Sequence, residues 1–329
     1  MKISVATTSI HDCSRYLRWL QACDPEVLVF VAVDRKTPKI KWPANAVELS
    51  LGFQERYKCK ALLGENTIEL RNTAILEALR AGADAIVLAD DDNLCLNAAY
   101  FADFEAAFTD IRLQVTGRNG WFDPGRLLSP DVRFRGFPHQ IEAAYDVQPP
   151  TDLKVGLAGG IVIGDPDIGA VERIAKAPIV HNFSELLRNG IVVDNNTWTV
   201  TNSQNTAVLR QFAPCMLTCP QFGRYADIFA SLVCQRVMRE HGYAVHIGLP
   251  AVWQQRNEHD LVKDLQDEIF GMAHIVEFAE FLDAIPFPSG LSVMQCVSLI
   301  YMGLRGWRYC PAGVPELAEA WLSDVEGVL

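Results

Sequence analysis

The sequence has no excess of positive charge and no long apolar run. Its 329 residues include 29 Lys and Arg against 40 Asp and Glu, which gives a formal net charge of −11. Because binding to phosphate backbones needs clustered Lys and Arg, we expect no general nucleic-acid-binding surface. A membrane-spanning helix needs about 18 consecutive apolar residues. No such stretch occurs, so we expect no membrane span.

The cysteines show no pairing pattern. There are nine of them, an odd number, scattered along the chain. Only Cys215 and Cys219 stand four residues apart, and the second pair that a zinc site would need is missing. Scattered thiols are typical of a reducing compartment, and the chain starts with a strand pattern and no signal peptide. We therefore predict free thiols and a cytoplasmic location.

The chain also has no internal repeat and no low-complexity linker. Its first half alternates apolar strand patterns with helical ones, which predicts parallel strands packed between helices. Further strand patterns follow. The segment 192–200 is expected to form a hairpin or a mobile loop, and the pattern from 273 onward predicts mostly helix. The sequence thus predicts an α/β fold with a mixed central sheet. We expect a Rossmann-like domain over 1–271 and a helical C-terminal segment over 272–329.

Three consecutive aspartates, Asp90, Asp91 and Asp92, follow the apolar strand pattern at 85–89. Adjacent carboxylates repel one another unless a cation neutralises them. Ligands of open α/β sheets bind outside the carboxyl ends of the strands, and a D-x-D pair suits Mg²⁺ or Mn²⁺ that carries a diphosphate. We predict Asp90 and Asp92 as metal ligands. The alternative is a solvated acidic turn that caps a helix starting near Asn93.

Polar residues that end or precede neighbouring strands are candidates for the same site. Asp34 ends the second strand and is placed to accept hydrogen bonds from a ribose or a base edge. Thr7 and Thr8 end the first strand with hydroxyl groups. Arg71 lies on the helix before the acidic strand and is suited to bidentate phosphate contact. A turn aspartate and a solvated helix face remain the alternatives.

Aromatic and glycine-containing loops supply further candidates. Trp121 and the 133–138 loop with Arg135 are plausible sugar platforms, and Gly160 allows close backbone approach to a ligand or marks a strand bulge. Asp227 opens a helix, where it interacts with the helix dipole or orients and deprotonates a hydroxyl. Trp253 begins a polar cluster that would close the metal–diphosphate site.

Several blocks of the chain, taken in order, resemble the reversibly glycosylated polypeptides, the UDP-arabinopyranose mutase family, whose members have a GT-A glycosyltransferase fold. The blocks span 31–34, 40–43, 88–92, 121–124, 134–138, 164–167, 222–227 and 248–253. This resemblance covers roughly residues 1 to 270 and implies a GT-A-type nucleotide-sugar-binding fold. It also implies that Asp90, Asp91 and Asp92 hold a divalent metal on the nucleotide diphosphate. Asp34 would then lie by the nucleoside and Arg71 near the phosphates.

Three positions depart from the family pattern. Glu142 stands where the family has the arginine implicated in reversible self-glycosylation. Ala226 replaces the first of the family's two consecutive acids, while the second is kept as Asp227. Gln254 stands where the family often has histidine. We therefore expect no self-labelling through an arginine. Glu142 is either a base or charge stabiliser near the sugar or an ordinary surface glutamate.

The leading functional prediction is a metal-dependent glycosyltransferase with a nucleoside-diphosphate sugar, and UDP-sugars in particular, as donor. A UDP-sugar pyranose/furanose mutase and a non-catalytic partner subunit are the alternatives. A decayed subunit would be expected to lose its metal carboxylates, so the intact triplet favours catalysis. We expect Asp227, Glu142 and Trp121 to line the sugar and acceptor end, opposite Asp34. The acceptor and the oligomeric state, a homo-oligomer included, stay open.

Overall fold

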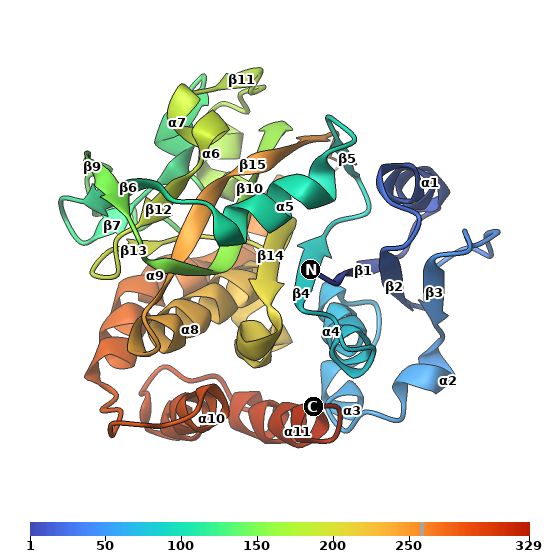
Figure 1. Ribbon diagram of the computed structural model, residues 1–329. Coiled ribbons are helices and arrows are strands. Elements are labelled where there is room, and N and C mark those ends of the chain that lie inside the picture. The colour runs from blue at the N-terminus through green and yellow to red at the C-terminus, as the bar shows by residue number, and fades with distance from the viewer. Residues whose placement is uncertain (257–259) are drawn as a thin grey trace.

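The structure is a computed structural model that describes residues 1–256 and 260–329 (Figure 1). An eleven-stranded mixed sheet runs through it in the order β3-β2-β1-β4-β14-β10-β15-β12-β6-β9, with β5 paired to β15. Its strands are β1 (Ile3–Ser9), β2 (Leu28–Val33), β3 (Ala46–Leu49), β4 (Ala85–Ala89), β5 (Asn93–Cys95), β6 (Arg112–Gly117), β9 (Tyr145–Thr151), β10 (Lys154–Gly164), β12 (Ile191–Val193), β14 (Asn205–Leu209) and β15 (Tyr243–Gln254). The prediction of an α/β fold with a mixed central sheet is confirmed.

Strand direction brings several chain segments to one edge of this sheet. The strands β1 to β4 are parallel, while β14 runs antiparallel to β4 and to β10, and β10 runs parallel to β15. The carboxyl ends of β1, β4, β10 and β15 therefore share an edge with the start of β14. At that edge Asn205 pairs with Ala89, directly before the three aspartates.

Helices cover both faces of the sheet, as Figure 1 shows. Within β2, Val29 and Val31 join one apolar cluster and Phe30 and Ala32 the other, because successive side chains of a strand point to opposite faces. The first cluster contains α1 (Ser14–Cys23) and α5 (Tyr100–Thr109), and the second contains α4 (Arg71–Arg80) and α8 (Ala226–Glu240). Burial on both faces explains why the strand patterns are almost continuously apolar.

The C-terminal helices α9 (Leu261–Ala284), α10 (Val293–Gly303) and α11 (Val314–Glu326) pack onto the second cluster. Trp321 donates from Nε1 to the carbonyl of Pro214 at 2.8 Å, and Asp324 accepts from the backbone N–H groups of Lys58 and Cys59 at 2.9 and 2.8 Å. The predicted boundary at 271 lies inside α9, where the Tyr225 ring fills the space of a Cβ on Gly271. No linker therefore separates the C-terminal segment at that position.

The remaining elements are short. They are α2 (Leu51–Gln54), α3 (Lys60–Leu63), α6 (Ala170–Ala175), α7 (Glu185–Asn189), the 3₁₀ helices η1 (Ile68–Leu70), η2 (Pro124–Leu127), η3 (Arg210–Cys215), η4 (Pro220–Tyr225) and η5 (Leu304–Gly306), and the strand pairs β7 (Trp121–Phe122) with β13 (Trp198–Thr199) and β8 (Leu128–Ser129) with β11 (Asn182–Phe183). No helix among the described residues has the length and apolar character needed to cross a membrane.

Two local expectations are wrong. The segment 192–200 is not a hairpin, because β12 pairs with β6 and β15 while β13 pairs with β7. No helix starts near Asn93 either, since Asn93–Cys95 forms β5 and pairs with β15. The aspartate triplet therefore lies in a turn between β4 and β5 and does not cap a helix there.

Candidate functional site

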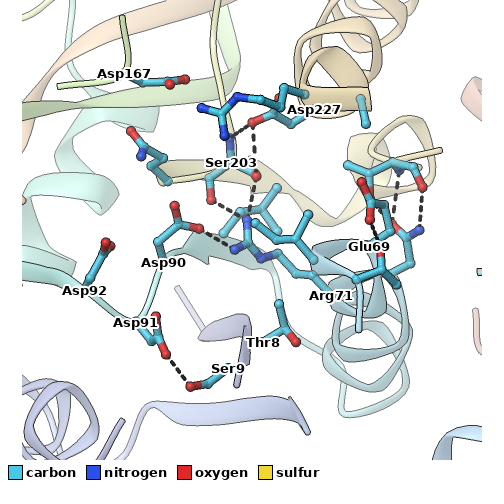
Figure 2. Close-up of a pocket in the computed structure, with 18 of the residues that line it drawn as sticks. Thr8, Ser9, Glu69, Arg71, Asp90, Asp91, Asp92, Asp167, Ser203 and Asp227 are labelled. Carbon is cyan, nitrogen blue, oxygen red and sulfur yellow. Dashed lines mark hydrogen bonds and ion pairs between the residues drawn. The ribbon is translucent and has the colours of Figure 1, made fainter. Parts of the chain in front are cut away.

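A pocket with a cavity of about 350 Å³ lies at the sheet edge where these strands end. Its walls come from the ends of β1 and β4, the segment before β14, the end of β15 and the starts of α4 and α8. Figure 2 shows Asp91 and Ser9 on one side of it and Asp227 and Asp167 on the other. The volume suits a small-molecule ligand.

The aspartate triplet forms one wall of this pocket. Asp91 accepts a hydrogen bond from the Ser9 hydroxyl, and the amide of Gln254 lies 3.4 Å from Asp92 Oδ2. Burial raises the pKa of Asp92 to about 7, with the charge of Asp90 adding to the effect. Burial also raises the pKa of Asp91, against the lowering effect of the Ser9 hydroxyl. The wall thus carries negative charge that its protein neighbours do not fully neutralise.

Arg71 joins this wall to the segment before β14. Its guanidinium forms an ion pair with Asp90 and donates to the backbone carbonyl of Ser203 at 2.7 Å and to its hydroxyl at 2.5 Å. The 3₁₀ turn η1 and the first turn of α4 place this side chain under the end of β4. A buried guanidinium with these partners fixes the orientation of Asp90.

A second buried group of charges forms the opposite side. Arg135 donates to both oxygens of Asp167, from Nε at 2.9 and 3.0 Å and from Nη2 at 2.6 Å, and it lies 3.3 Å from Asp227. Burial alone would raise the pKa of Asp167, but the Arg135 guanidinium holds it well below its usual range. Asp227 also accepts from the backbone N–H of Ser203 at 3.1 Å. Ser203 therefore connects the two sides of the pocket through Arg71 and Asp227.

The donor set fits a divalent cation that arrives with a diphosphate. Among the described residues, no three His, Cys, Asp or Glu side chains gather closely enough to hold an ion by themselves. Asp90 and Asp92 offer hard carboxylate oxygens and leave coordination positions for phosphate oxygens, as Mg²⁺ and Mn²⁺ sites commonly do. The raised pKa of Asp92 marks the place where a cation would relieve uncompensated charge.

Most of the residues expected at the phosphate end do line the pocket. The sequence-predicted residues that line it are Thr8, Arg71, Asp90, Asp91, Asp92, Arg135 and Asp227. Thr7 and Asp34 do not. Thr7 is buried and donates to the carbonyl of Ala89 at 2.7 Å, because it lies in β1, which pairs with β4. Asp34 accepts from the backbone N–H of Asn66, which lines the pocket, so it supports that wall from behind.

Of the three residues expected at the sugar and acceptor end, Asp227 lines the pocket, while Trp121 and Glu142 do not, and Gly160 and Trp253 also lie outside the lining. Trp121 is 4% exposed and packs against Trp198, so it belongs to the core and is not a loop platform. Glu142 is exposed in the segment before β9 and outside the pocket lining. Gly160 lies in β10, where the side chain of Asn205 occupies the space of a Cβ. Trp253 points away to solvent, at 36% exposure.

Several pocket residues were not predicted. They are Glu69, Asp167, Ser203 and Gln204, whereas Gln254 and Arg256 belong to the polar cluster beginning at Trp253 that was expected to close the site. Burial raises the pKa of Glu69 to about 7, which makes it a titratable group at the far end of the cavity from Asp92 (Figure 2). No local pattern marks these four residues as functional. The pairing of β14 with β4 brings Ser203 and Gln204 to the acidic wall, Asp167 follows the end of β10, and Glu69 lies in η1.

Two structural neighbours are distant from this chain in sequence. No protein-family model matches the sequence, and no curated protein matches it. The mannosyltransferase PcManGT from Pyrobaculum calidifontis, solved with GDP-Man and Mn²⁺, is similar at 12% identity and a TM-score of 0.43, over 99% of this chain and 86% of that chain. Glucosyl-3-phosphoglycerate synthase from Mycobacterium tuberculosis, solved with Mn²⁺ and UDP-glucose, is similar at 12% identity and a TM-score of 0.41, over 88% and 81% of the two chains.

Proposed function

We propose that this protein is a metal-dependent glycosyltransferase with a nucleoside-diphosphate sugar, in particular a UDP-sugar, as donor. The observation that carries the proposal is the aspartate triplet on the wall of a pocket that also contains the guanidinium groups of Arg71 and Arg135. Carboxylates for a cation and guanidinium groups for phosphate oxygens are the two elements that a diphosphate needs. The ordered sequence blocks shared with the UDP-arabinopyranose mutase family support the choice of UDP.

The aspartate wall would hold the diphosphate. Asp90 and Asp92 supply the metal ligands, while Asp91 is bound by Ser9 and positions the turn. When bound, the metal neutralises the charge that develops on the leaving diphosphate. The nucleoside would then lie toward Thr8 and Asn66, on the side that Asp34 supports.

Asp227 is the proposed residue at the reacting end. It lies across the pocket from Asp91 in Figure 2, and its side chain is 13% exposed. Its carboxylate is oriented by Ser203 and by Arg135, so it is fixed in the direction of the cavity. A carboxylate held in this way can orient or deprotonate an acceptor hydroxyl. Glu142 has no part in this proposal, because it lies outside the pocket lining.

The test is incubation of the purified protein with a panel of UDP- and GDP-sugars in the presence of Mn²⁺ or of EDTA. Free nucleotide, ring-isomerised sugar nucleotide and protein-bound sugar are measured in each reaction. We expect metal-dependent release of nucleoside diphosphate from one donor, stimulated by an acceptor. The variant D92N should abolish this release, while D152N, which removes an exposed aspartate outside the pocket lining, should not.

Three other outcomes of the same experiment would contradict the proposal. Interconversion of sugar ring forms without an acceptor would show that the protein is a mutase and not a transferase. Sugar attached to the 135–145 peptide would show that the protein glycosylates itself although Glu142 replaces the arginine. Binding of a donor with none of these reactions, in the presence of a broad acceptor set, would favour the non-catalytic subunit.

A further inference from the structure

The guanidinium of Arg256 is buried in the pocket wall and has no close partner among the described residues. Its side chain is 8% exposed, and carboxylate oxygens of Asp167 and Asp165 lie 3.7 Å and 3.9 Å away from it. Its hydrogen bond to Gln254 is long, at 3.4 Å, and Nε has no hydrogen-bond partner among the described residues. Buried donors of a charged group are costly to leave unsatisfied.

The two nearby carboxylates are already engaged by other arginines. Asp167 accepts three hydrogen bonds from Arg135 at 2.6 to 3.0 Å. Asp165 forms an ion pair with Arg173, whose guanidinium also donates to the carbonyl of Pro166 at 2.9 Å. The close contacts of both carboxylates are therefore made by Arg135 and Arg173, and Arg256 is left with long contacts of 3.7 and 3.9 Å to them.

The position of Arg256 connects it to the aspartate wall. Gln254 bridges the two, because its Nε2 lies 3.4 Å from Asp92 Oδ2 and its Oε1 lies 3.4 Å from Arg256 Nη2. Arg256 lines the pocket, as Asp92 does. A single amide side chain thus separates the loosely paired guanidinium of Arg256 from the proposed metal ligand.

We infer that Arg256 binds a phosphate group of the diphosphate, in the donor and in the nucleotide product. The inference rests on the proposed function and identifies Arg256 as the cationic residue that contacts the phosphate beside the metal. A planar guanidinium matches phosphate oxygens in a bidentate manner, and its attraction for them is strengthened in a pocket shielded from water. Phosphate binding would supply the hydrogen bonds that Nε and the loosely paired Nη2 lack.

Isothermal titration with Mn²⁺ tests the inference on the full-length protein, with UDP and inorganic pyrophosphate as ligands. R256Q should weaken both affinities by about tenfold or more, as expected for the loss of a charge-assisted contact. R256K keeps the charge without the planar fork and should recover part of the loss. R173Q is the matched control, because Arg173 belongs to the same buried network but does not line the pocket. Its affinities should stay close to those of the wild type.

Two results would overturn the inference: R256Q binding both ligands as tightly as the wild type, or R173Q losing as much affinity as R256Q. Where R256Q does not fold, as judged by circular dichroism, R256K decides, and unchanged affinity in that variant contradicts the inference. Failure of the proposed function is distinct from these results. If the wild type binds pyrophosphate through Arg256 but releases nucleotide from no donor, the phosphate site is supported and the proposed transferase activity is contradicted.

Discussion

Arg71 holds Asp90 in place through a buried ion pair, and the same guanidinium binds the Ser203 backbone carbonyl at 2.7 Å. The two side chains are 4% and 20% exposed, so the pair is largely shielded from water while Asp90 still reaches the pocket. The contact joins the start of α4 to a segment 132 residues later in the chain. One arginine therefore serves both the fold and the orientation of a proposed metal ligand.

The first prediction concerns the stability that this pair provides. R71M should lower the free energy of unfolding by about 2 to 4 kcal/mol, because it leaves the largely shielded carboxylate of Asp90 and a buried carbonyl without their donor. Chemical denaturation measures the loss. The control is R35M, which breaks the exposed pair of Arg35 with Glu65, at 71% and 37% exposure, and should cost less than about 1 kcal/mol. Equal losses in the two variants would contradict the structural role of Arg71.

The second prediction is that Asp92 is required for metal-dependent nucleotide binding. In D92A the fold should survive, since the hydrogen bonds that the described residues make to this side chain are long contacts of 3.4 and 3.5 Å from Gln254. Calorimetry with a nucleoside diphosphate and Mn²⁺ should show no metal-dependent binding. The exposed aspartate variant D152N should bind as the wild type does. Unchanged binding by D92A would remove the metal site from this wall.

A third prediction separates turnover from binding at Asp227. D227N should reduce kcat by two orders of magnitude or more while the nucleotide affinity changes by less than about threefold, because general acid–base groups contribute roughly 10²- to 10⁴-fold. Steady-state kinetics and calorimetry on the same preparation give the two quantities. Parallel loss of both would mean that Asp227 acts through Arg135, with which it pairs, and not on the substrate.

The fourth prediction concerns the pH dependence of stability at Asp123. This side chain is 1% exposed, accepts from the backbone N–H of Gly125 at 2.9 Å, and has its other carboxylate oxygen buried without a partner among the described residues. Burial raises the pKa of Asp123 to about 7 from an ordinary 3.8. The folded state thus keeps a proton that the unfolded state has lost between these two values. Stability from this group is full below the lower value and falls as the pH rises toward 7.

D123N removes this titration, since an amide stays neutral. The free energy of unfolding of D123N relative to the wild type should therefore increase with pH, on the order of 2 to 3 kcal/mol between pH 5 and 7.5. Denaturation curves at several pH values measure the difference. The exposed variant D152N should show a flat difference, and a flat difference for D123N as well would show that Asp123 is charged in the folded protein.

The sequence predicted the elements whose signals are local. The strand at 85–89 is continuously apolar and ends at three aspartates, so its burial and the position of the acids follow from a few adjacent residues. The helix that carries Arg71 was recognised from its periodicity in the same way, although its first residues form the 3₁₀ turn η1. Patterns of this kind depend on neighbours within one or two turns of chain.

The prediction of exposed aromatic loops from the local sequence was wrong at Trp121. Trp121 stands beside Gly, Pro and polar residues, which is typical of an exposed loop. It is buried because β7 pairs with β13, and that pairing places Trp198 against it. A two-residue strand has almost no local signal, since its stability comes from the partner and from the surrounding core.

What the amino-acid sequence determined by itself is therefore the α/β character, the run of parallel strands and the acidic end of β4. Only the tertiary structure decided which groups face those acids. Ser203 and Gln204 reach them because β14 runs antiparallel to β4, and Asp167, Gln254 and Arg256 reach them because β10 and β15 end at the same edge. The physical reason is that strand order and direction are set by burial of the whole sheet between two layers of helices, a condition that no single segment of the chain contains.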